Sequence, residues 1–154
     1  MKAYMKTHRG LVREQNEDTI CVAEPLYVLA DGMGGHQAGE VASALAARTL
    51  CETLRDMQPS ADALTRGYLA ANSAVFARQK EDETLSGMGT TMTALWEDQE
   101  YVFVGQIGDS RAYLYRDGKL HQITEDQSMV GEMLRAVLTG APYHQALFAQ
   151  TELR

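Results

Sequence analysis

An apolar run that leads into an acidic, glycine-rich loop constrains this chain more than any other feature. The run Leu26–Ala30 is followed by Asp31 and then by glycines at positions 32, 34 and 35. This pattern predicts a buried strand that delivers a carboxylate at its end into the loop. Glycines let the backbone approach a ligand closely, and their carbonyl oxygens bind hard cations such as Mg²⁺ or Mn²⁺ beside carboxylates. Asp31 and the Gly32 carbonyl are therefore candidate metal ligands, although a plain strand-to-helix turn capped by Asp31 also accounts for these residues.

Nucleotide-binding loops also place glycines between a strand and a helix. Here the glycine spacing is not GxGxxG, and no Gly-Lys-Ser or Gly-Lys-Thr precedes the predicted helix. The loop therefore matches neither the dinucleotide-binding fingerprint nor the phosphate-binding loop of nucleotide hydrolases.

Two other segments present acidic side chains next to predicted strands. Glu17 and Asp18 follow Arg13 in a short polar stretch, and Asp109 lies in the sequence Gly-Asp-Ser after an apolar run. Each segment has an ordinary alternative, a solvated loop in the first case and a hairpin turn in the second. Their joint occurrence with Asp31 favours three converging carboxylate sites, which suggests a two-metal centre.

The order of the predicted elements indicates an α+β fold. Apolar or β-branched runs predict strands over 19–23, 26–30, 90–96, 101–106 and 111–115. Between the second and third strands, apolar residues at helical spacing predict one helix from Glu40 to near Pro59 and another from a cap at Ser60 to about residue 83. Links of hairpin length predict a largely antiparallel sheet with the helices packed on it.

Charge and cysteine content exclude several classes of protein. The formal net charge of −7 argues against non-specific nucleic-acid binding, because that binding rests on Lys and Arg side chains. No apolar run approaches the roughly 18 residues of a membrane span, and the amino terminus lacks the apolar stretch of a signal peptide. Cys21 and Cys51 form no CxxC pair, which argues against a zinc site and a disulfide scaffold. We expect one cytoplasmic domain without a nucleic-acid or membrane partner.

Five segments together resemble the PPM-type (2C-type) metal-dependent protein serine/threonine phosphatases. In chain order they are Arg13-x-x-Asn16-Glu17-Asp18, Asp31-Gly32-Met33-Gly34-Gly35-His36, Gly87-x-Gly89-Thr90-Thr91, Gly108-Asp109-Ser110-Arg111 and Ile123-Thr124-x-Asp126-x-Ser128. Their order and approximate spacing are those of the family, and unrelated folds have no reason to combine them. The chain is identified as a bacterial member of this family.

The resemblance implies a set of metal ligands. Asp31 bridges two Mn²⁺ or Mg²⁺ ions, and the Gly32 carbonyl binds one of them. Glu17 and Asp18 hold waters on the metals, and Asp109 contributes to a third, weaker metal site. All five residues stand at the matching positions of the motifs.

It also implies the fold and the reaction. The family fold is an antiparallel β-sandwich flanked by helices, in α-β-β-α layers. The reaction is hydrolysis of phosphoserine and phosphothreonine in proteins, in which Arg13 binds the phosphate and a water between the two cations attacks phosphorus. The substrates are phosphoproteins, here expected to be those of a bacterial serine/threonine kinase. His36 is an accessory candidate for proton delivery or substrate choice, or is simply an exposed loop histidine.

The resemblance runs from about Thr7 to Arg135, so residues 1–135 are interpreted as the amino-terminal part of the family domain and 136–154 as a divergent tail. The family has two further metal-binding aspartates, in a Ser-Asp-Gly and an Asp-Asn segment, and neither segment occurs here. An incomplete fold with fewer anionic ligands predicts weakened metal binding and impaired turnover. The alternatives are an inactive, phosphatase-like binding module and a non-functional gene remnant.

Overall fold

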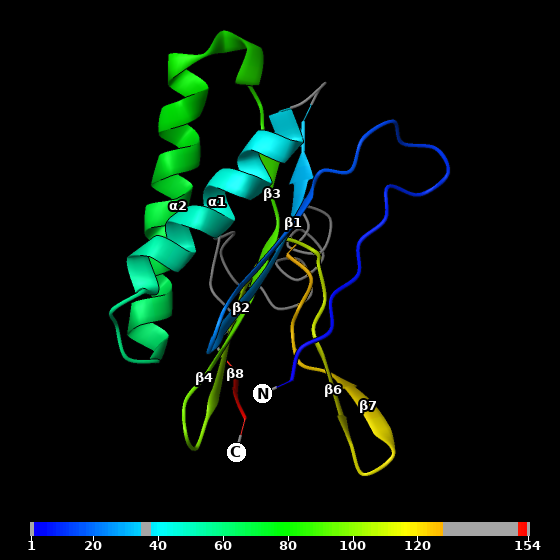
Figure 1. Cartoon of the computed structure of the whole chain (residues 1–154), viewed down its shortest axis with the longest axis vertical. Coiled ribbons are helices and arrows are strands. Elements are labelled where there is room, and N and C mark those ends of the chain that lie inside the picture. The colour runs from blue at the N-terminus through cyan, green and yellow to red at the C-terminus, as the bar shows by residue number, and fades with distance from the viewer. Residues whose placement is uncertain (1, 35–37, 128–150, 154) are drawn as a thin grey trace, which may run out of the picture.

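A sheet that carries two helices on one side forms the body of the molecule (Figure 1). The computed structural model describes residues 2–34, 38–127 and 151–153. The elements are β1 (Asp18–Ala23), β2 (Leu26–Met33), α1 (Ala38–Leu54), α2 (Ala61–Glu81), the short 3-10 helix η1 (Glu83–Leu85), β3 (Gly89–Thr90), β4 (Met92–Glu97), β5 (Val102–Ile107), β6 (Tyr113–Arg116), β7 (Lys119–Gln122) and β8 (Thr151–Leu153).

Every pairing among the described strands is antiparallel. The main sheet has the order β1-β2-β4-β5-β8, and β3 pairs with the end of β2. Strands β6 and β7 form a separate two-stranded sheet, which lies on the side of the main sheet away from the helices (Figure 1). The predicted α+β class and the antiparallel sheet are therefore confirmed.

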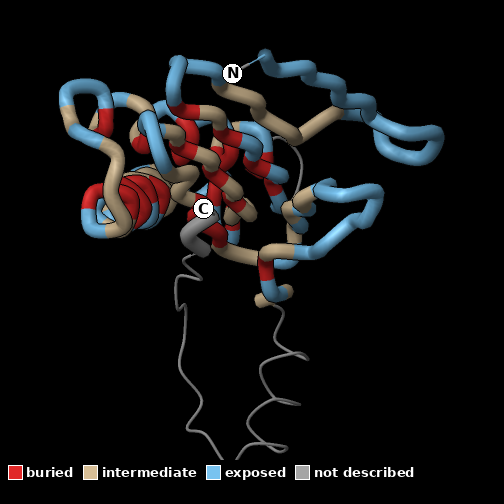
Figure 2. The backbone as a smooth tube through the Cα atoms, turned by 90° about the horizontal axis from the view of Figure 1, so that it is seen from below, coloured by how far each residue is buried: buried red, intermediate tan, exposed pale blue. Residues whose placement is uncertain are grey.

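Strand β2 shows why one face of the sheet is buried. Its residues alternate between the two faces, so that Leu26, Val28 and Ala30 point toward the helices and are buried. Asp31 belongs to the alternate set on the opposite face and is exposed. The core consequently lies between the sheet and the helices, while the amino-terminal stretch and the β6–β7 hairpin are mostly exposed (Figure 2).

Small side chains allow the two helices to pack closely. The buried side of α1 is rich in alanine, including Ala42, Ala46 and Ala47. On α2, a Cβ atom added at Gly67 would lie 2.6 Å from Cδ1 of Leu50 in α1. Because these positions lack bulk, α1 fits between α2 and the sheet.

Some predicted boundaries are wrong. Strand β2 continues through Met33, so Asp31 and Gly32 lie inside a strand and not in a loop after it. Helix α1 ends at Leu54, well before Pro59. The expected cap at Ser60 is confirmed, because its hydroxyl oxygen accepts a hydrogen bond from the Ala63 amide at 3.2 Å.

The segment after β5 also differs from the prediction. The strand expected over 111–115 lies at Tyr113–Arg116 and pairs with Lys119–Gln122, a strand that the sequence pattern did not predict. Strand β5 pairs with β4 and β8, so Gly-Asp-Ser does not close a hairpin between β5 and β6. Its first residue, Gly108, has a φ of +90°, in the region that favours glycine, and turns the chain out of the main sheet.

Of the expected α-β-β-α layers, the described residues contain one helical layer, the main sheet and the small β6–β7 sheet. The expected boundary at residue 135 and most of the tail 136–154 lie outside the described residues. The part of the tail that is described, Thr151–Leu153, pairs with β5 and forms the edge of the main sheet. Neither of the described helices has the length and apolar character needed to cross a membrane.

Candidate active site

Two carboxylates face each other across the β1–β2 hairpin. Asp18 is directly opposite Asp31 in the antiparallel register, so both side chains stand on the sheet face that the helices leave uncovered. Like charges directly opposite in a sheet are destabilising. A pair of this kind at the end of a hairpin therefore indicates a binding function more than a structural one.

Glu17 is tied to β2 and to α1 through its backbone. Its carbonyl oxygen accepts hydrogen bonds from the Gly32 amide at 3.1 Å and from the Ser43 hydroxyl at 2.7 Å. Ser43 is fully buried, and its Oγ is also 2.9 Å from Oγ1 of Thr19. A Cβ atom on Gly32 would lie 2.0 Å from the carbonyl oxygen of Gly39, and one on Gly39 would lie 2.7 Å from Cδ of Glu17. The two glycines thus permit the close approach of three segments.

The backbone of Asp31 is held by the Gly-Thr-Thr segment. The Thr91 amide donates to the Asp31 carbonyl oxygen at 2.9 Å, and the Asp31 amide donates to Oγ1 of Thr91 at 3.2 Å. Oγ1 of Thr90 lies 3.0 Å from the same carbonyl oxygen. Since backbone and hydroxyl groups all act on Asp31, this motif positions the strand that carries the carboxylate.

Asp109 reaches the site from the turn that follows β5. The next residue, Ser110, places its hydroxyl 2.7 Å from that of Thr91. A Cβ atom on Gly108 would lie 2.7 Å from Cγ2 of Thr91, so the turn packs directly on the residue that holds Asp31. The Gly-Asp-Ser and Gly-Thr-Thr motifs are therefore neighbours in space.

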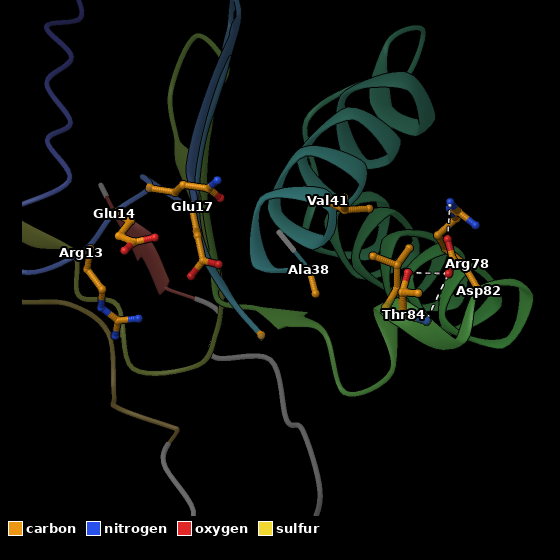
Figure 3. Close-up of a pocket in the computed structure, with 11 residues that line it drawn as sticks. Arg13, Glu14, Glu17, Ala38, Val41, Arg78, Asp82 and Thr84 are labelled. Carbon is orange, nitrogen blue, oxygen red and sulfur yellow. Dashed lines mark hydrogen bonds and ion pairs between the residues drawn. The ribbon is translucent and has the colours of Figure 1, made fainter. Parts of the chain in front are cut away.

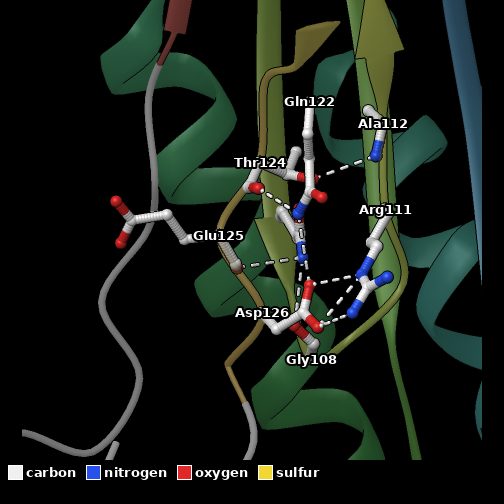
Figure 4. A network of polar contacts seen from close by, with 8 residues as sticks. Gly108, Arg111, Ala112, Gln122, Thr124, Glu125 and Asp126 are labelled. Carbon is white, nitrogen blue, oxygen red and sulfur yellow. Dashed lines mark hydrogen bonds and ion pairs between the residues drawn. The ribbon is translucent and has the colours of Figure 1, made fainter. Parts of the chain in front are cut away.

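A network of polar contacts fixes the far side of this turn (Figure 4). The carboxylate of Asp126 accepts hydrogen bonds from Nε of Arg111 at 2.8 Å and from Nη2 at 2.5 Å. The amide of Ala112 donates to Oγ1 of Thr124 at 2.9 Å, and Nε2 of Gln106 donates to the Gly108 carbonyl oxygen at 3.0 Å. These contacts give the Ile-Thr-x-Asp segment a structural role, since it braces the loop that bears Asp109.

The amino-terminal stretch adds a contact that the sequence did not suggest. Oγ1 of Thr7 donates to Oδ2 of Asp18 at 2.6 Å and accepts from Nδ2 of Asn16 at 2.8 Å. Oδ1 of Asn16 in turn accepts from the Asp18 amide at 3.1 Å. Asn16 therefore forms a local turn that orients Asp18, which explains its role in the motif.

The electrostatics of Asp31 show that the charged groups converge. The Asp31 residue as a whole is exposed, but its carboxyl group is partly buried. This burial is the main reason that the pKa of Asp31 lies above 3.8. The negative charges of Asp18, Asp109 and Glu17 raise this pKa further, and the positive charge of Arg13 lowers it. Side chains from two other segments thus meet around the carboxyl group of Asp31.

A groove of about 1020 Å³ begins beside this cluster. Figure 3 shows Arg13 and Glu17 on one side of it, α1 with Val41 in the middle, and the end of α2 with Arg78 on the other side. Asp31 is not part of the lining, so the groove meets the acidic cluster through Arg13 and Glu17. An extended peptide could occupy the groove with a side chain directed at Arg13.

The donors fit a hydrated hard cation. No three His, Cys, Asp or Glu side chains within 2–34, 38–127 and 151–153 are close enough together to hold a metal ion directly. Mg²⁺ and ions like it keep several of their waters and need only one or two carboxylates. Partial burial first, and the negative charges of Asp18, Asp109 and Glu17 second, raise the pKa of Asp31, and a bound cation would offset both. Asp31 is therefore the candidate for a direct ligand, with the other carboxylates around it.

Most predicted site residues are brought together. Arg13, Glu17, Asp18 and Asp109 all act on the carboxyl group of Asp31, and Gly32 lies beside Glu17. His36 lies outside the described residues. Ser43 and Thr7 were missed, because a serine on an apolar helix face and a threonine in a polar stretch are common in proteins of every kind.

Comparison with known proteins gives a consistent result. The family model described as Protein phosphatase 2C matches residues 9–146. The serine/threonine protein phosphatase PstP of Mycobacterium tuberculosis is 46% identical over 128 residues, which are 81% of this chain and 25% of that protein. The serine/threonine phosphatase stp of Listeria monocytogenes is 38% identical over 146 residues, which are 88% of this chain and 58% of that protein.

Solved structures agree with these matches. The crystal structure of the Mycobacterium tuberculosis phosphatase PstP/Ppp superimposes with a TM-score of 0.81 at 36% identity and covers 96% of this chain and 71% of that one. The catalytic domain of PstP in complex with two manganese ions gives a TM-score of 0.80 at 38% identity, with 97% and 71% covered. The chain spans between a quarter and 58% of the length of the two curated relatives named above.

Proposed function

Because this chain belongs to the protein phosphatase 2C family, we propose that it hydrolyses phosphoserine and phosphothreonine in proteins with the help of Mn²⁺ or Mg²⁺. The observation that carries this proposal is the convergence of Asp18, Asp109, Glu17 and Arg13 on Asp31. Two similar proteins are named serine/threonine phosphatases, and one solved relative holds two manganese ions. The names support the reaction, and the manganese-bound relative supports the metal.

Each charged residue has a proposed task. Asp31 is proposed as the central metal ligand, with the Gly32 carbonyl beside it, and Glu17 and Asp18 would hold the hydration shell of the cations. Asp109 is proposed to serve a third, weaker cation. When bound, the cations would supply Lewis acidity at the phosphoryl group and make a water more acidic. The chain itself fixes the backbone of Glu17 through a hydrogen bond from Ser43, and the backbone of Asp31 through a hydrogen bond to Thr91.

Arg13 is proposed to bind the phosphoryl group. Its guanidinium is exposed beside Glu17 at one end of the groove, and its planar fork of donors suits two phosphate oxygens. The groove that continues toward Arg78 offers room for the peptide on one side of the phosphorylated residue. We propose phosphoproteins of a bacterial serine/threonine kinase, in the cytoplasm, as the substrates.

Release of phosphate from a phosphothreonine peptide tests the reaction. The purified chain should release phosphate with Mn²⁺ and stop when a chelator is added. Asp31→Asn should lower kcat on the order of 10²-fold or more, because the central anionic ligand is lost. Arg13→Ala should mainly raise KM, whereas Arg66→Ala, an exposed arginine on α2, should change neither constant. Metal-independent release, or equal effects of the two arginine variants, would contradict the proposed site.

Thermal unfolding separates a lost metal site from a lost fold. The pKa of Asp31 is higher in the folded state than its ordinary value of 3.8, so ionisation of Asp31 lowers the free energy of unfolding. This loss of stability develops as the pH rises from 3.8 through the folded-state pKa. At neutral pH without metal, Asp31→Asn should therefore be at least as stable as the natural chain. Mn²⁺ should raise the Tm of the natural chain more than that of the variant. A variant destabilised in chelator would show that Asp31 has a structural role instead.

A second candidate function is phosphopeptide binding without turnover. It is favoured by the lack of any cluster of three direct metal ligands among the described residues. In that case the folded chain would bind a phosphothreonine peptide through Arg13 and release no phosphate at any Mn²⁺ concentration. The Arg13→Ala variant would then lose binding, while Asp31→Asn would keep it.

A further inference from the structure

Two cysteine side chains meet where the first strand packs on the first helix. Cys21 lies in β1 and Cys51 lies near the end of α1. They are 30 residues apart in sequence, but their Sγ atoms are 2.9 Å apart. Both are free thiols of intermediate exposure that pack against the edge of the core. Neither belongs to the acidic cluster or to the groove.

The fold fixes this pair from both sides. Along β1, Thr19 and Cys21 share the face that points to the helices. Along α1, positions 43, 47 and 51 follow one another at a spacing that keeps them near one side of the helix. The Thr19 and Ser43 hydroxyls, 2.9 Å apart, form a second contact between the same two elements. The thiols are thus held together by the packing of α1 on β1 and not by a chance orientation of two loops.

We propose that Cys21 and Cys51 form a reversible intramolecular disulfide when the protein meets a small-molecule disulfide such as glutathione disulfide. One thiolate attacks a sulfur of the reagent, forms a mixed disulfide and releases one reduced glutathione. The second cysteine then attacks the protein sulfur of the mixed disulfide and releases the other glutathione. The two protein thiols lose two electrons and two protons in total, and the reagent gains both.

The geometry suits the second step in particular. Bonded sulfurs are about 2.05 Å apart, so closing the ring from the 2.9 Å contact needs only a small movement. The pKa of Cys51 is raised to about 12. Burial is the main cause, and the hydrogen bond with Cys21 is the second. Burial therefore disfavours the thiolate form of Cys51.

The crosslink would enclose the segment that carries the site. The loop between the two cysteines contains all of β2, with Asp31, and most of α1, with Ser43. Closing a loop of this length restricts the unfolded chain and should raise the Tm on the order of 10 °C. The oxidised protein should accordingly resist unfolding better than the reduced protein while keeping the same arrangement of strand and helix.

Mass spectrometry of the full chain tests the pair. The reduced protein is equilibrated with mixtures of reduced and oxidised glutathione and quenched in acid, and the mass of the intact chain is then measured. The natural chain should lose the mass of two hydrogen atoms and retain no glutathione. Cys21→Ser and Cys51→Ser should never show this loss, and they should carry at most one glutathione. Peptide mapping without reductant should recover the segments of Cys21 and Cys51 as one linked species.

A matched equilibrium in urea makes the test independent of the variants. The measured quantity is the ratio of reduced to oxidised glutathione at which half of the disulfide is reduced. This ratio should be at least roughly tenfold higher for the folded natural chain than for the chain unfolded in urea, because folding holds the thiols together. An equal ratio in the two states would overturn the proposal. So would stable glutathione adducts on the folded natural chain, a crosslink between two chains, or a Tm that does not rise on oxidation.

Discussion

The two sides of the acidic cluster are built in different ways. On the β1–β2 side, the segment of Glu17 and Asp18 is tied to buried groups, above all to the fully buried Ser43 and to Gly32. On the other side, Asp109 is carried by a turn that is braced by the exposed pair Arg111–Asp126, next to a hairpin whose β7 residues are all exposed. Both sides direct a carboxylate at Asp31. The second side also contacts the buried Gln106 and Thr124, but it alone is braced by an ion pair that solvent reaches.

This difference predicts where the site can be damaged. A group held by core packing transmits any change of volume or hydrogen bonding into the main sheet. A group held by exposed polar contacts can lose one of them and be solvated by water instead. Substitutions on the β1–β2 side should therefore cost more stability than comparable substitutions on the hairpin side.

The largest effect is expected for Gly32→Ala. Its new Cβ would meet the Gly39 backbone oxygen at 2.0 Å, and backbone atoms of two segments would have to move, at a cost of about 3 kcal/mol or more. The matched control is Gly118→Ala in the β6–β7 turn, where φ is +74° and the added Cβ meets nothing within 4 Å. That change should cost only about 1 kcal/mol, through backbone strain. Urea unfolding of both variants measures the difference, and equal costs would show that the two sides tolerate added volume equally.

A smaller loss is expected for Ser43→Ala. The variant leaves the Glu17 carbonyl oxygen without its buried hydroxyl donor and should lose about 1–3 kcal/mol of unfolding free energy. It should also weaken the stabilisation by Mn²⁺, because Glu17 loses one of its two anchors. Ser73→Ala is the control, since the exposed Ser73 only donates to Leu69 within its own helix and should change stability by less than about 0.5 kcal/mol. Equal behaviour of the two variants in thermal melts would mean that Ser43 does not anchor Glu17.

The smallest effect is expected for Asp126→Asn, and it should depend on pH. Hydrogen bonds from Arg111 are the first cause that holds the pKa of Asp126 below 3.8 in the folded state. The stabilisation is therefore present above 3.8 and is lost as the pH falls through the folded pKa. The variant should melt slightly below the natural chain at neutral pH, and the two curves should merge well below pH 3.8. A difference that persists in acid would mean that Asp126 acts through packing and not through its charge.

Local patterns predicted much of the fold. The Ser60 cap and the two apolar helix faces each depend on residues a few positions apart, which interact in the same way in many proteins. The turn between β6 and β7 is local in the same sense, because Asp117 and Gly118 both have the positive φ values that an Asp-Gly pair accepts readily. The five motifs also selected the charged residues that the structure brings together.

Contacts between distant segments were decided only by the tertiary structure. The pairing of Asp18 with Asp31 depends on the register of the hairpin, and a shift of one residue would move either carboxylate to the other face. The Ser43–Glu17 and Cys21–Cys51 contacts arise because α1 packs on β1, and the spacing of these residues carries no signal of it. The sequence by itself thus determined which residues are acidic, flexible or apolar, and in what order. The packing of the sheet and the helices decided which of these residues meet, because the free energy of that packing depends on contacts over whole surfaces and not on any short segment.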